Sequence, residues 1–572
     1  MPDQSFEPVR RSDLLWLAAA VLLLVATGIG VRDPWPADEP RFASLARDMA
    51  QGGEWLFPRV GGDLYQDKPP VYFWLLAAAY EVIGSVRWSY LIPSLLAACG
   101  VLLLVYDMGR RLAGRKAGLL AALTLACTVQ FLTTMRSAQI DATLCLLMTL
   151  SLYSLLRHLF WGPAWGWYFL GGFAAGLGVV TKGVGFLPIL VLLLYWPMRR
   201  YRWQGLAPIP KGGWRWAIAP LAMLLGICLW FVPMLLAVAV KNDAEYTAYR
   251  DEILFQQTVT RYATAWHHHQ PWYFFVVQVI PALWLPWSLL LFWLVPRWRE
   301  AWQARNAHIW LPLGWVLVLL LFFSLTPGKR GIYLHPALPA VALAAAPFLS
   351  ALFLRRGVQR AGLALAGLVI VGALVFAGAH LAGAPFAHKA IQDANLNGPW
   401  PIYLFLALSL TGVGFALWRM PIAAWGAVTI ALALTFSYAL APAMNPERSG
   451  SGFMQRVESQ LQPGELLGLV AYKEQFLLYL DRPTVNFGHR RWLEGKQEGY
   501  DATAWLAGSP NRVLLVPGQF LAPCFDRATD RRAAGASAGD EWYLIRGTAS
   551  ADCASRGNAG RAIGYDPRPD RN

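Results

Sequence analysis

Two charged strings in the polar stretch 32–86 contain residue types suited to group transfer. The first is Asp38-Glu39 with Arg41, and the second is Tyr65-Gln66-Asp67-Lys68. A carboxylate can act as a base or orient an acceptor, and a lysine can neutralise a phosphate leaving group. Both strings also have ordinary interpretations, because an acidic pair can cap a surface helix and Lys68 can extend to a membrane interface.

Further ionisable residues interrupt or border long apolar runs. They are Asp141 at the start of one run, Lys182 in a Thr-Lys-Gly break, and Lys329, Arg330 and Tyr333 between two runs. Ionisable groups near membrane depth are costly and are usually paired or functional, so their clustering predicts a polar cavity at one face. Asp141 also has an alternative interpretation as a helix N-cap.

The composition indicates which elements must position these residues. Of 572 residues, 56% are hydrophobic and only 15% are charged, which excludes a soluble monomer. A spanning helix needs about 20 mostly apolar residues, and we expect about 13 such helices. The apolar runs are 14–31, 88–106, 117–134, 140–156, 165–181, 184–198, 216–240, 272–296, 309–325, 333–354, 361–383, 400–418 and 421–441.

The net charge of +15 is distributed unevenly between alternate loops. With a cytoplasmic N-terminus, most Lys and Arg residues of the short loops fall on the cytoplasmic side, as the positive-inside rule requires. No small-residue cleavage pattern follows the first run, so we expect an uncleaved anchor. The sequence thus predicts a transmembrane domain over 1–441, whose loop 32–86 faces outward, and an external domain over 442–572.

The tail from 442 onward is polar and contains short apolar stretches. We expect a small soluble α/β domain with strands at Leu466–Ala471, Phe476–Leu480, Arg512–Val516 and Trp542–Ile545. In an oxidising compartment, Cys524 and Cys553 should form a disulfide. The other four cysteines lie inside apolar runs and are expected to be small core residues.

Four strings together resemble one known family in order and spacing. They are Asp38-Glu39-Pro40-Arg41-Phe42, Tyr65-Gln66-Asp67-Lys68-Pro69-Pro70, Ile140-Asp141 and Thr181-Lys182-Gly183. The chain resembles the bacterial aminoarabinose transferases, GT-C membrane glycosyltransferases related to the protein O-mannosyltransferases, over roughly residues 14–345. It departs from many relatives at Pro40 and at Gln66-Asp67, but neither change removes a charge.

The resemblance implies a GT-C fold and transfer between two lipids. Family members move 4-amino-4-deoxy-L-arabinose from undecaprenyl phosphate to a lipid A phosphate at the periplasmic face of the bacterial inner membrane. The modified lipid A is less negative and binds polymyxin and other cationic peptides less well. Because both substrates are lipids, we expect that no nucleotide sugar is needed. We also expect that the protein is a monomer and that it does not bind nucleic acid.

The resemblance also implies roles for individual residues. Asp38 and Asp141 are the expected catalytic carboxylates. The residues expected at the donor phosphate and sugar are Lys68, Tyr65, Arg41, Arg261 and Tyr333. Those considered for the acceptor phosphate are Lys182, Lys329 and Arg330.

No metal or other cofactor is expected to be required. His267-His268-His269 could still bind a divalent ion such as zinc incidentally, although consecutive side chains on a helix do not face one another. Three other functions stay open. They are another polyprenyl-phosphate-sugar transferase such as a protein O-mannosyltransferase, a lipid transporter or flippase, and a scaffold with a sensor tail.

Overall fold

The computed structural model describes residues 6–209, 213–254, 269–419, 421–489, 494, 496–526 and 528–571. The chain divides into two compact units, which are described separately. The helical unit comprises residues 1–29, 67–72 and 91–440, and the mixed unit comprises 30–66, 73–90 and 441–572. The polar stretch after the first apolar run therefore belongs largely to the same unit as the tail.

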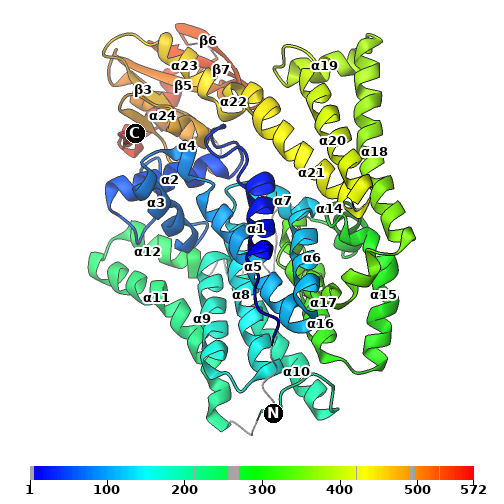
Figure 1. Ribbon diagram of the computed structural model, residues 1–572. Coiled ribbons are helices and arrows are strands. Elements are labelled where there is room, and N and C mark those ends of the chain that lie inside the picture. The colour runs from blue at the N-terminus through cyan, green and yellow to red at the C-terminus, as the bar shows by residue number, and fades with distance from the viewer. Residues whose placement is uncertain are drawn as a thin grey trace. The chain divides into compact units, whose positions relative to one another are not determined.

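The helical unit is built from helices and short helical turns (Figure 1). Its elements are α1 (Arg11–Ala20), η1 (Val21–Val25), α5 (Ile92–Ala113), α6 (Arg115–Ala126), α7 (Val129–Met135), α8 (Ile140–Trp161), α9 (Trp165–Lys182), η2 (Val184–Leu190), α10 (Val191–Arg200), η3 (Gly213–Ala217), α11 (Ile218–Lys241), α12 (Ala244–Asp251), η5 (Phe275–Val279), α14 (Ile280–Leu283), α15 (Trp287–Gln303), α16 (Ala307–Leu325), η6 (Gly331–Leu334), α17 (Ala337–Leu352), α18 (Arg356–Leu381), α19 (Pro385–Asp393), α20 (Trp400–Arg419), η7 (Pro421–Ala423), α21 (Ala424–Thr435) and η8 (Phe436–Leu440).

Among the described residues, seven helices are long and apolar enough to cross a membrane, or up to nine if each of two bent pairs is one span. The protein is thus a polytopic helical membrane protein. The bent pairs are α6 with α7, at 67°, and η5–α14 with α15, at 111°. The expected count of about 13 is not confirmed. The remaining four apolar runs correspond to α1 with η1, α9, η2 with α10, and α17, which do not meet the same criterion of length and hydropathy.

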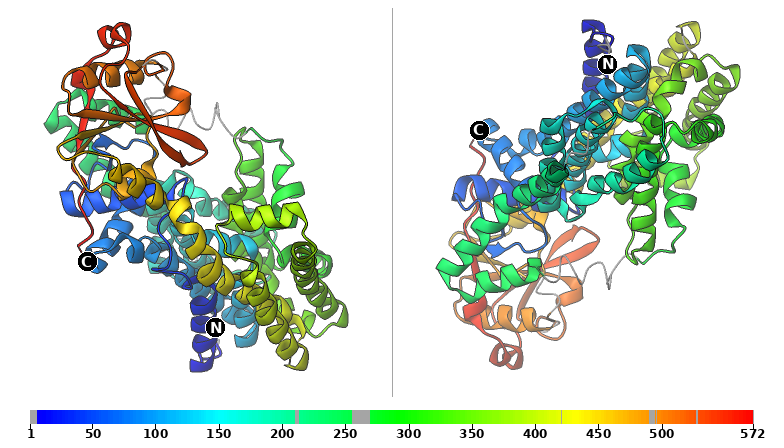
Figure 2. Two further views of the ribbon diagram at one scale, coloured as in Figure 1. Left: turned by 90° about the horizontal axis from the view of Figure 1, so that it is seen from above. Right: turned by 90° about the horizontal axis from the view of Figure 1, so that it is seen from below.

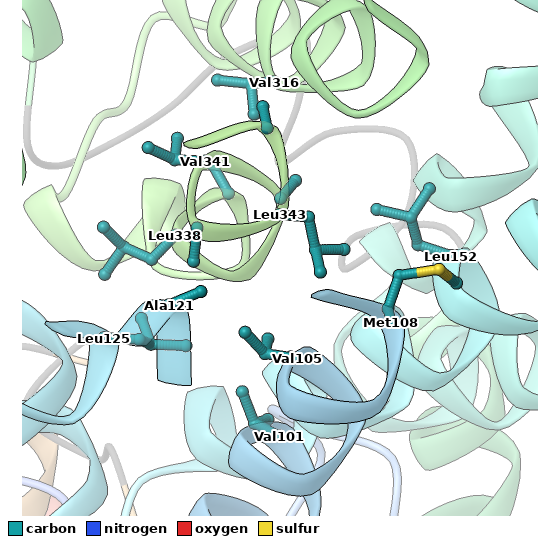
Figure 3. Close-up of a cluster of buried hydrophobic side chains, with 14 of the residues drawn as sticks. Val101, Val105, Met108, Ala121, Leu125, Leu152, Val316, Leu338, Val341 and Leu343 are labelled. Carbon is teal, nitrogen blue, oxygen red and sulfur yellow. The ribbon is translucent and has the colours of Figure 1, made fainter. Parts of the chain in front are cut away.

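The core of the helical unit lies where α17 packs against α5 and α6 (Figure 3). Leu338 and Leu343 of α17 belong to one buried cluster with Val105 of α5 and Ala121 and Leu125 of α6. A glycine allows α5 and α6 to approach each other closely, since a Cβ on Gly118 of α6 would lie 2.4 Å from the Tyr106 carbonyl oxygen of α5. A second group of adjacent helices is formed by α18, α20 and α21 (Figure 2).

One arginine ties the first helix of the helical unit to its last. Arg136 donates to the Leu24 carbonyl and the Thr27 hydroxyl, both at 2.5 Å, and to the Ser437 hydroxyl at 2.7 Å. Leu24 lies in η1 and Ser437 lies in η8, two π-helical turns. The Leu24 carbonyl lies in the last turn of its helix, where carbonyls have no intrahelical partner, and here the guanidinium donates to it.

The mixed unit contains a six-stranded sheet and a small hairpin. Its elements are α2 (Glu39–Gly52), β1 (Arg59–Val60), β2 (Asp63–Leu64), most of α3 (Val71–Ile83), α4 (Val86–Ser89), α22 (Ala441–Ser449), α23 (Ser451–Ser459), β3 (Leu466–Leu469), η9 (Glu474–Leu478), β4 (Thr484–Asn486), α24 (Gln497–Ala507), β5 (Arg512–Pro517), η11 (Gly518–Phe520), β6 (Asp530–Ser537), β7 (Asp540–Arg546), α25 (Ala551–Arg556), η12 (Ala559–Arg561) and β8 (Ile563–Tyr565).

The strand order of the large sheet is β6-β7-β5-β3-β4-β8. The two pairs of β3, with β4 and with β5, are parallel, and the other pairs are antiparallel. Residues 513–517 of β5 are all buried, as expected for a central strand that is covered on both faces. The predicted α/β character of the tail is confirmed as a mixed sheet with helices.

Two details of the tail prediction have clear outcomes. Cys524 and Cys553 are disulfide-bonded, as predicted. The strand predicted at Phe476–Leu480 is wrong, because this run lies largely in the 3₁₀ turn η9. Phe476 and Leu477 are buried there. The Phe476 ring packs against those of Phe453 and Trp542, and η9 also contacts α2, so a short apolar run that suggested a strand is instead the buried face of a turn.

Candidate active site

Asp141 and Lys182 form a close ion pair in the helical unit. Lys182 Nζ lies 2.5 Å from Asp141 Oδ1, and the side chains are 17% and 11% exposed. The packed helices α8 and α9 supply one partner each, and Gly183, at φ +70°, allows the chain to turn directly after Lys182. The N-cap residue of α8 is Gln139, so Asp141 pairs with a lysine and does not cap its helix.

Aromatic groups surround this ion pair. Lys182 Nζ lies 5.1 Å from the ring centroid of Tyr333 in η6, within the range of a cation–π interaction. His335, two residues later, is fully buried and stacks on Phe131 with ring centroids 5.9 Å apart. Its side chain interacts electrostatically with Asp141 and Lys182. The structure therefore brings together three predicted site residues, Asp141, Lys182 and Tyr333. It adds His335, which was not predicted because a single histidine beside an apolar run is not a recognisable signal.

The other predicted cations of the helical unit have different surroundings. Lys68 Nζ donates to the carbonyl oxygen of its neighbour Asp67 at 3.0 Å. Lys329 is buried, and its Nζ donates to the carbonyl oxygens of Thr326 at 2.6 Å and Gln270 at 2.8 Å. Arg330 is exposed. Lys329 therefore joins its own loop to the segment at Gln270, whereas Arg330 presents its charge to the surroundings.

In the mixed unit, Asp38 and Arg41 share a cluster with a residue of the tail. Asp38 occupies the N-cap position of α2, but its side chain makes no capping hydrogen bond. Arg41 lies 3.8 Å from Asp38 and only 2.8 Å from Glu474 of η9. Burial lowers the pKa of Arg41, but the charge of Glu474 and the contacts with Tyr65 and Asp38 outweigh it and raise the net pKa above its usual value. Arg41 is thus a permanent cation held between two carboxylates.

Glu39, the second member of the acidic pair, has a structural position. Its carboxylate accepts two hydrogen bonds from Arg32, at 2.5 and 2.9 Å, and one from the Trp35 backbone N–H at 2.9 Å. The Arg32 guanidinium also lies 4.9 Å from the Trp35 ring centroid. These contacts bury Glu39 and fix the start of α2. The two neighbouring carboxylates therefore differ: that of Glu39 is engaged by Arg32 and Trp35, whereas that of Asp38 is partly exposed.

Tyr65 lies in the same cluster of the mixed unit. It is buried and hydrogen-bonds Arg41, and its ring centroid lies 5.8 Å from that of His489. His489 Nδ1 is 3.8 Å from the Glu474 carboxylate. Asp38, Arg41 and Tyr65 are therefore brought together as predicted neighbours, and Glu474 and His489 are additions that come from the tail.

The remaining predicted residues cannot be located in the same way. Arg261, His267 and His268 lie outside the described residues. Within the described part of the chain, no group of three or more His, Cys, Asp or Glu side chains is arranged to hold a metal ion. The described candidates thus form paired carboxylates and cations, an arrangement suited to binding a phosphate and a sugar that carries charge.

Comparison with known proteins identifies relatives of this chain. The family model described as dolichyl-phosphate-mannose-protein mannosyltransferase matches residues 67–222. A Pseudomonas aeruginosa (strain UCBPP-PA14) protein named undecaprenyl phosphate-alpha-4-amino-4-deoxy-L-arabinose arabinosyl transferase is 32% identical over 433 residues, which cover 72% of this chain and 73% of that protein. A protein of the same name from Edwardsiella ictaluri (strain 93-146) is 28% identical over 58% of this chain and 59% of its own length.

A solved structure shares the fold. ArnT from Cupriavidus metallidurans, bound to undecaprenyl phosphate, matches with a TM-score of 0.68 at 20% identity, over 93% of this chain and 97% of that one. The match extends through the tail, so the combination of a helical unit and a mixed unit is common to both proteins.

Proposed function

Because the chain belongs to the family of undecaprenyl phosphate-α-4-amino-4-deoxy-L-arabinose arabinosyl transferases, we propose that it transfers this amino sugar from undecaprenyl phosphate to a lipid A phosphate. It is a membrane glycosyltransferase. The observation that carries the proposal is the 32% identity across 72% of the chain with a relative whose name states the carrier and the sugar. The paired charges of both units support it, because each substrate contains a phosphate and the sugar contains an amine.

The reaction replaces one oxygen at the anomeric carbon by another. An oxygen of the acceptor phosphate forms the new bond to the anomeric carbon, and the bond from that carbon to the carrier phosphate oxygen breaks, releasing undecaprenyl phosphate. Negative charge therefore develops on the leaving phosphate while positive charge develops on the sugar ring. The site has to supply cations for the first charge and carboxylates for the second.

We assign roles to the described residues on that basis. Lys68 neutralises the leaving phosphate, and Asp38 orients the acceptor or the amino sugar. A phosphate monoester has its second pKa near 6 and is largely ionised at neutral pH, so Asp38 has little need to remove a proton. Asp141 stabilises the sugar cation.

The other cations have distinct parts in the proposal. Arg41 and Tyr65 bind the donor. Lys182 is paired with Asp141 at 2.5 Å, so an acceptor phosphate that binds Lys182 has to share it with this carboxylate. Arg330, which is exposed, is the better candidate for a first contact with the acceptor.

The proposal includes an orientation in the bacterial inner membrane. The N-terminus is cytoplasmic and the mixed unit is periplasmic, since this places the basic short loops inside. An odd number of spans is then required, and about 13 are obtained if α1–η1, α9, η2–α10 and α17 also cross the membrane. A disulfide between Cys524 and Cys553 is consistent with a periplasmic tail.

A second candidate is a protein O-mannosyltransferase. It is favoured by one observation, the match of residues 67–222 to the corresponding family model. The two activities differ in the sugar supplied and in the acceptor, which is a hydroxyl side chain in one case and a lipid phosphate in the other. Offering the protein both donors and both acceptors therefore distinguishes the two activities.

Expression in a bacterial strain that makes the donor but lacks its own transferase tests the proposal. We expect lipid A from these cells to gain the mass of one aminopentose and the cells to tolerate more polymyxin. The Asp38→Asn variant, produced to the same level, should give neither change. Transfer by isolated membranes should survive a metal chelator, because the proposal includes no metal cofactor. Unmodified lipid A with abundant wild-type protein would overturn the assignment.

A further inference from the structure

Arg41 pairs with two carboxylates, and Glu474 of the tail is closer to it than Asp38. Glu474 Oε1 accepts from Arg41 Nε at 2.9 Å and lies 2.8 Å from Nη2. The distance from Arg41 to Asp38 is 3.8 Å, one ångström longer. The three side chains are between 18% and 29% exposed, so water screens these charges only partly.

This geometry determines how available the Asp38 carboxylate is. The attraction between two charges rises as their separation falls. Arg41 uses Nε and Nη2 for Glu474 and has only Nη1 near Asp38, at a distance too long for a hydrogen bond. Glu474 therefore holds Arg41 where the guanidinium does not hydrogen-bond Asp38. Without Glu474, Asp38 is the carboxylate that still pairs with Arg41 among the described residues, and the cation would move onto it.

We infer that Glu474 is a positioning residue for the transfer reaction: by binding Arg41, it keeps the Asp38 carboxylate available for substrate. The inference rests on the proposed function, because it concerns the same transfer. It gives the C-terminal domain a direct part in the chemistry, since the domain supplies the partner that sets the charge around Asp38.

Other contacts keep α2 attached to the tail when Glu474 changes. Arg47 donates to the Leu477 carbonyl oxygen at 3.0 Å and lies 3.1 Å from the Tyr565 hydroxyl. Tyr565 in turn hydrogen-bonds Asp48 at 3.0 Å. These contacts lie one to two helical turns from Arg41 and do not involve Glu474. The Glu474→Gln variant should consequently fold, and its loss of function can be measured.

The test measures steady-state transfer between the donor lipid and lipid A by full-length protein in detergent. Glu474→Gln should lower kcat about 10-fold or more, because the amide keeps an acceptor oxygen but loses the charge that holds Arg41, and should change KM less than 2-fold. Glu474→Asp should recover part of the rate. In the Arg41→Gln background, the Glu474→Gln change should cost less than 2-fold, because the cation it restrains is gone.

Glu465→Gln is the matched control. Glu465 pairs with Arg546 at 2.6 Å, both side chains are about as buried as the Glu474 pair, and both belong to the same unit. This variant should transfer sugar at the wild-type rate. If Glu474→Gln and Glu465→Gln have equal activity while the wild type is active, the positioning role is wrong and the proposed function stands. If the wild type itself transfers nothing, the proposed function fails first.

Discussion

The ion pair of Asp141 and Lys182 allows a quantitative prediction. At the observed 2.5 Å, two unit charges attract each other by about 7 kcal/mol for an effective dielectric constant of about 20. Loss of solvation offsets much of this attraction. Removal of one partner still costs about 3–5 kcal/mol, because it leaves a charge that is buried without its counterion.

We therefore expect Lys182→Met and Asp141→Asn each to lower the Tm substantially. At about 2 °C per kcal/mol for a large domain, the decrease is roughly 6–10 °C. The Asp141→Asn/Lys182→Met double variant should lose less than half of that, since neither charge remains. Thermal melts of purified protein in detergent measure all three. Glu300→Gln, which breaks the exposed Arg297 pair, is the control and should shift the Tm by less than about 2 °C.

The same variants separate stability from catalysis. If Asp141 contacts the reacting sugar, the double variant recovers more than half of the Tm lost by the single variants but stays at least about 100-fold less active than wild type. A wild-type Tm in both single variants would refute the electrostatic reasoning. Full activity in the double variant would show that Asp141 serves only to pair with Lys182.

Three further predictions concern single features. Lys68→Met should lower kcat about 100-fold and Lys68→Arg should retain part of the activity, since a cation is needed at the leaving phosphate. Equal transfer rates for Lys68→Met and wild type would contradict this role. Replacing Cys524 and Cys553 by serine opens a loop with a sequence separation of 29 and should cost about 3–4 kcal/mol, seen as earlier unfolding and easier proteolysis of the tail; an unchanged Tm would show that the disulfide adds nothing. Arg546 holds the pKa of Glu465 below its usual value, so the stabilisation by this pair is complete above that usual value, about 4.5, and is lost as the pH falls through the lowered pKa. The Tm difference between wild type and Glu465→Gln should be full at pH 7 and shrink as the pH falls below about 4.5; a difference that grows with acidity would contradict the sign.

Much of the helical unit was predictable because its signal is local. A run of apolar residues long enough to cross a membrane identifies a helix without knowledge of its neighbours. The number of spans was less predictable, since α17 is only 16 residues long and α9 contains several glycines and a terminal lysine. Whether such helices cross depends on their packing partners, which hydropathy does not describe.

The site was predictable where its residues lie in recognisable strings. Asp38, Lys68, Asp141 and Lys182 were all selected in this way, and the pairing of Asp141 with Lys182 followed only from the structure. Contacts between distant segments carry no local signal. Glu474 lies 433 residues from Arg41 and Ser437 lies 301 residues from Arg136, so neither contact could be found from one sequence.

The same limit explains the wrong strand at Phe476–Leu480. A run of five apolar or aromatic residues fits a buried strand as well as a turn with one buried face. The run packs against segments distant in the sequence, namely α2 and the rings of Phe453 and Trp542. Local periodicity contains no information about these partners.

The central claim is tested most directly by the mass of lipid A after incubation with purified protein and undecaprenyl phosphate-linked aminoarabinose, with a mannose-linked carrier and a serine-rich peptide in parallel. The account predicts that only lipid A gains mass, by one aminopentose, and that Asp38→Asn and Lys68→Met abolish the gain. Lipid A of unchanged mass beside a glycosylated peptide would contradict it.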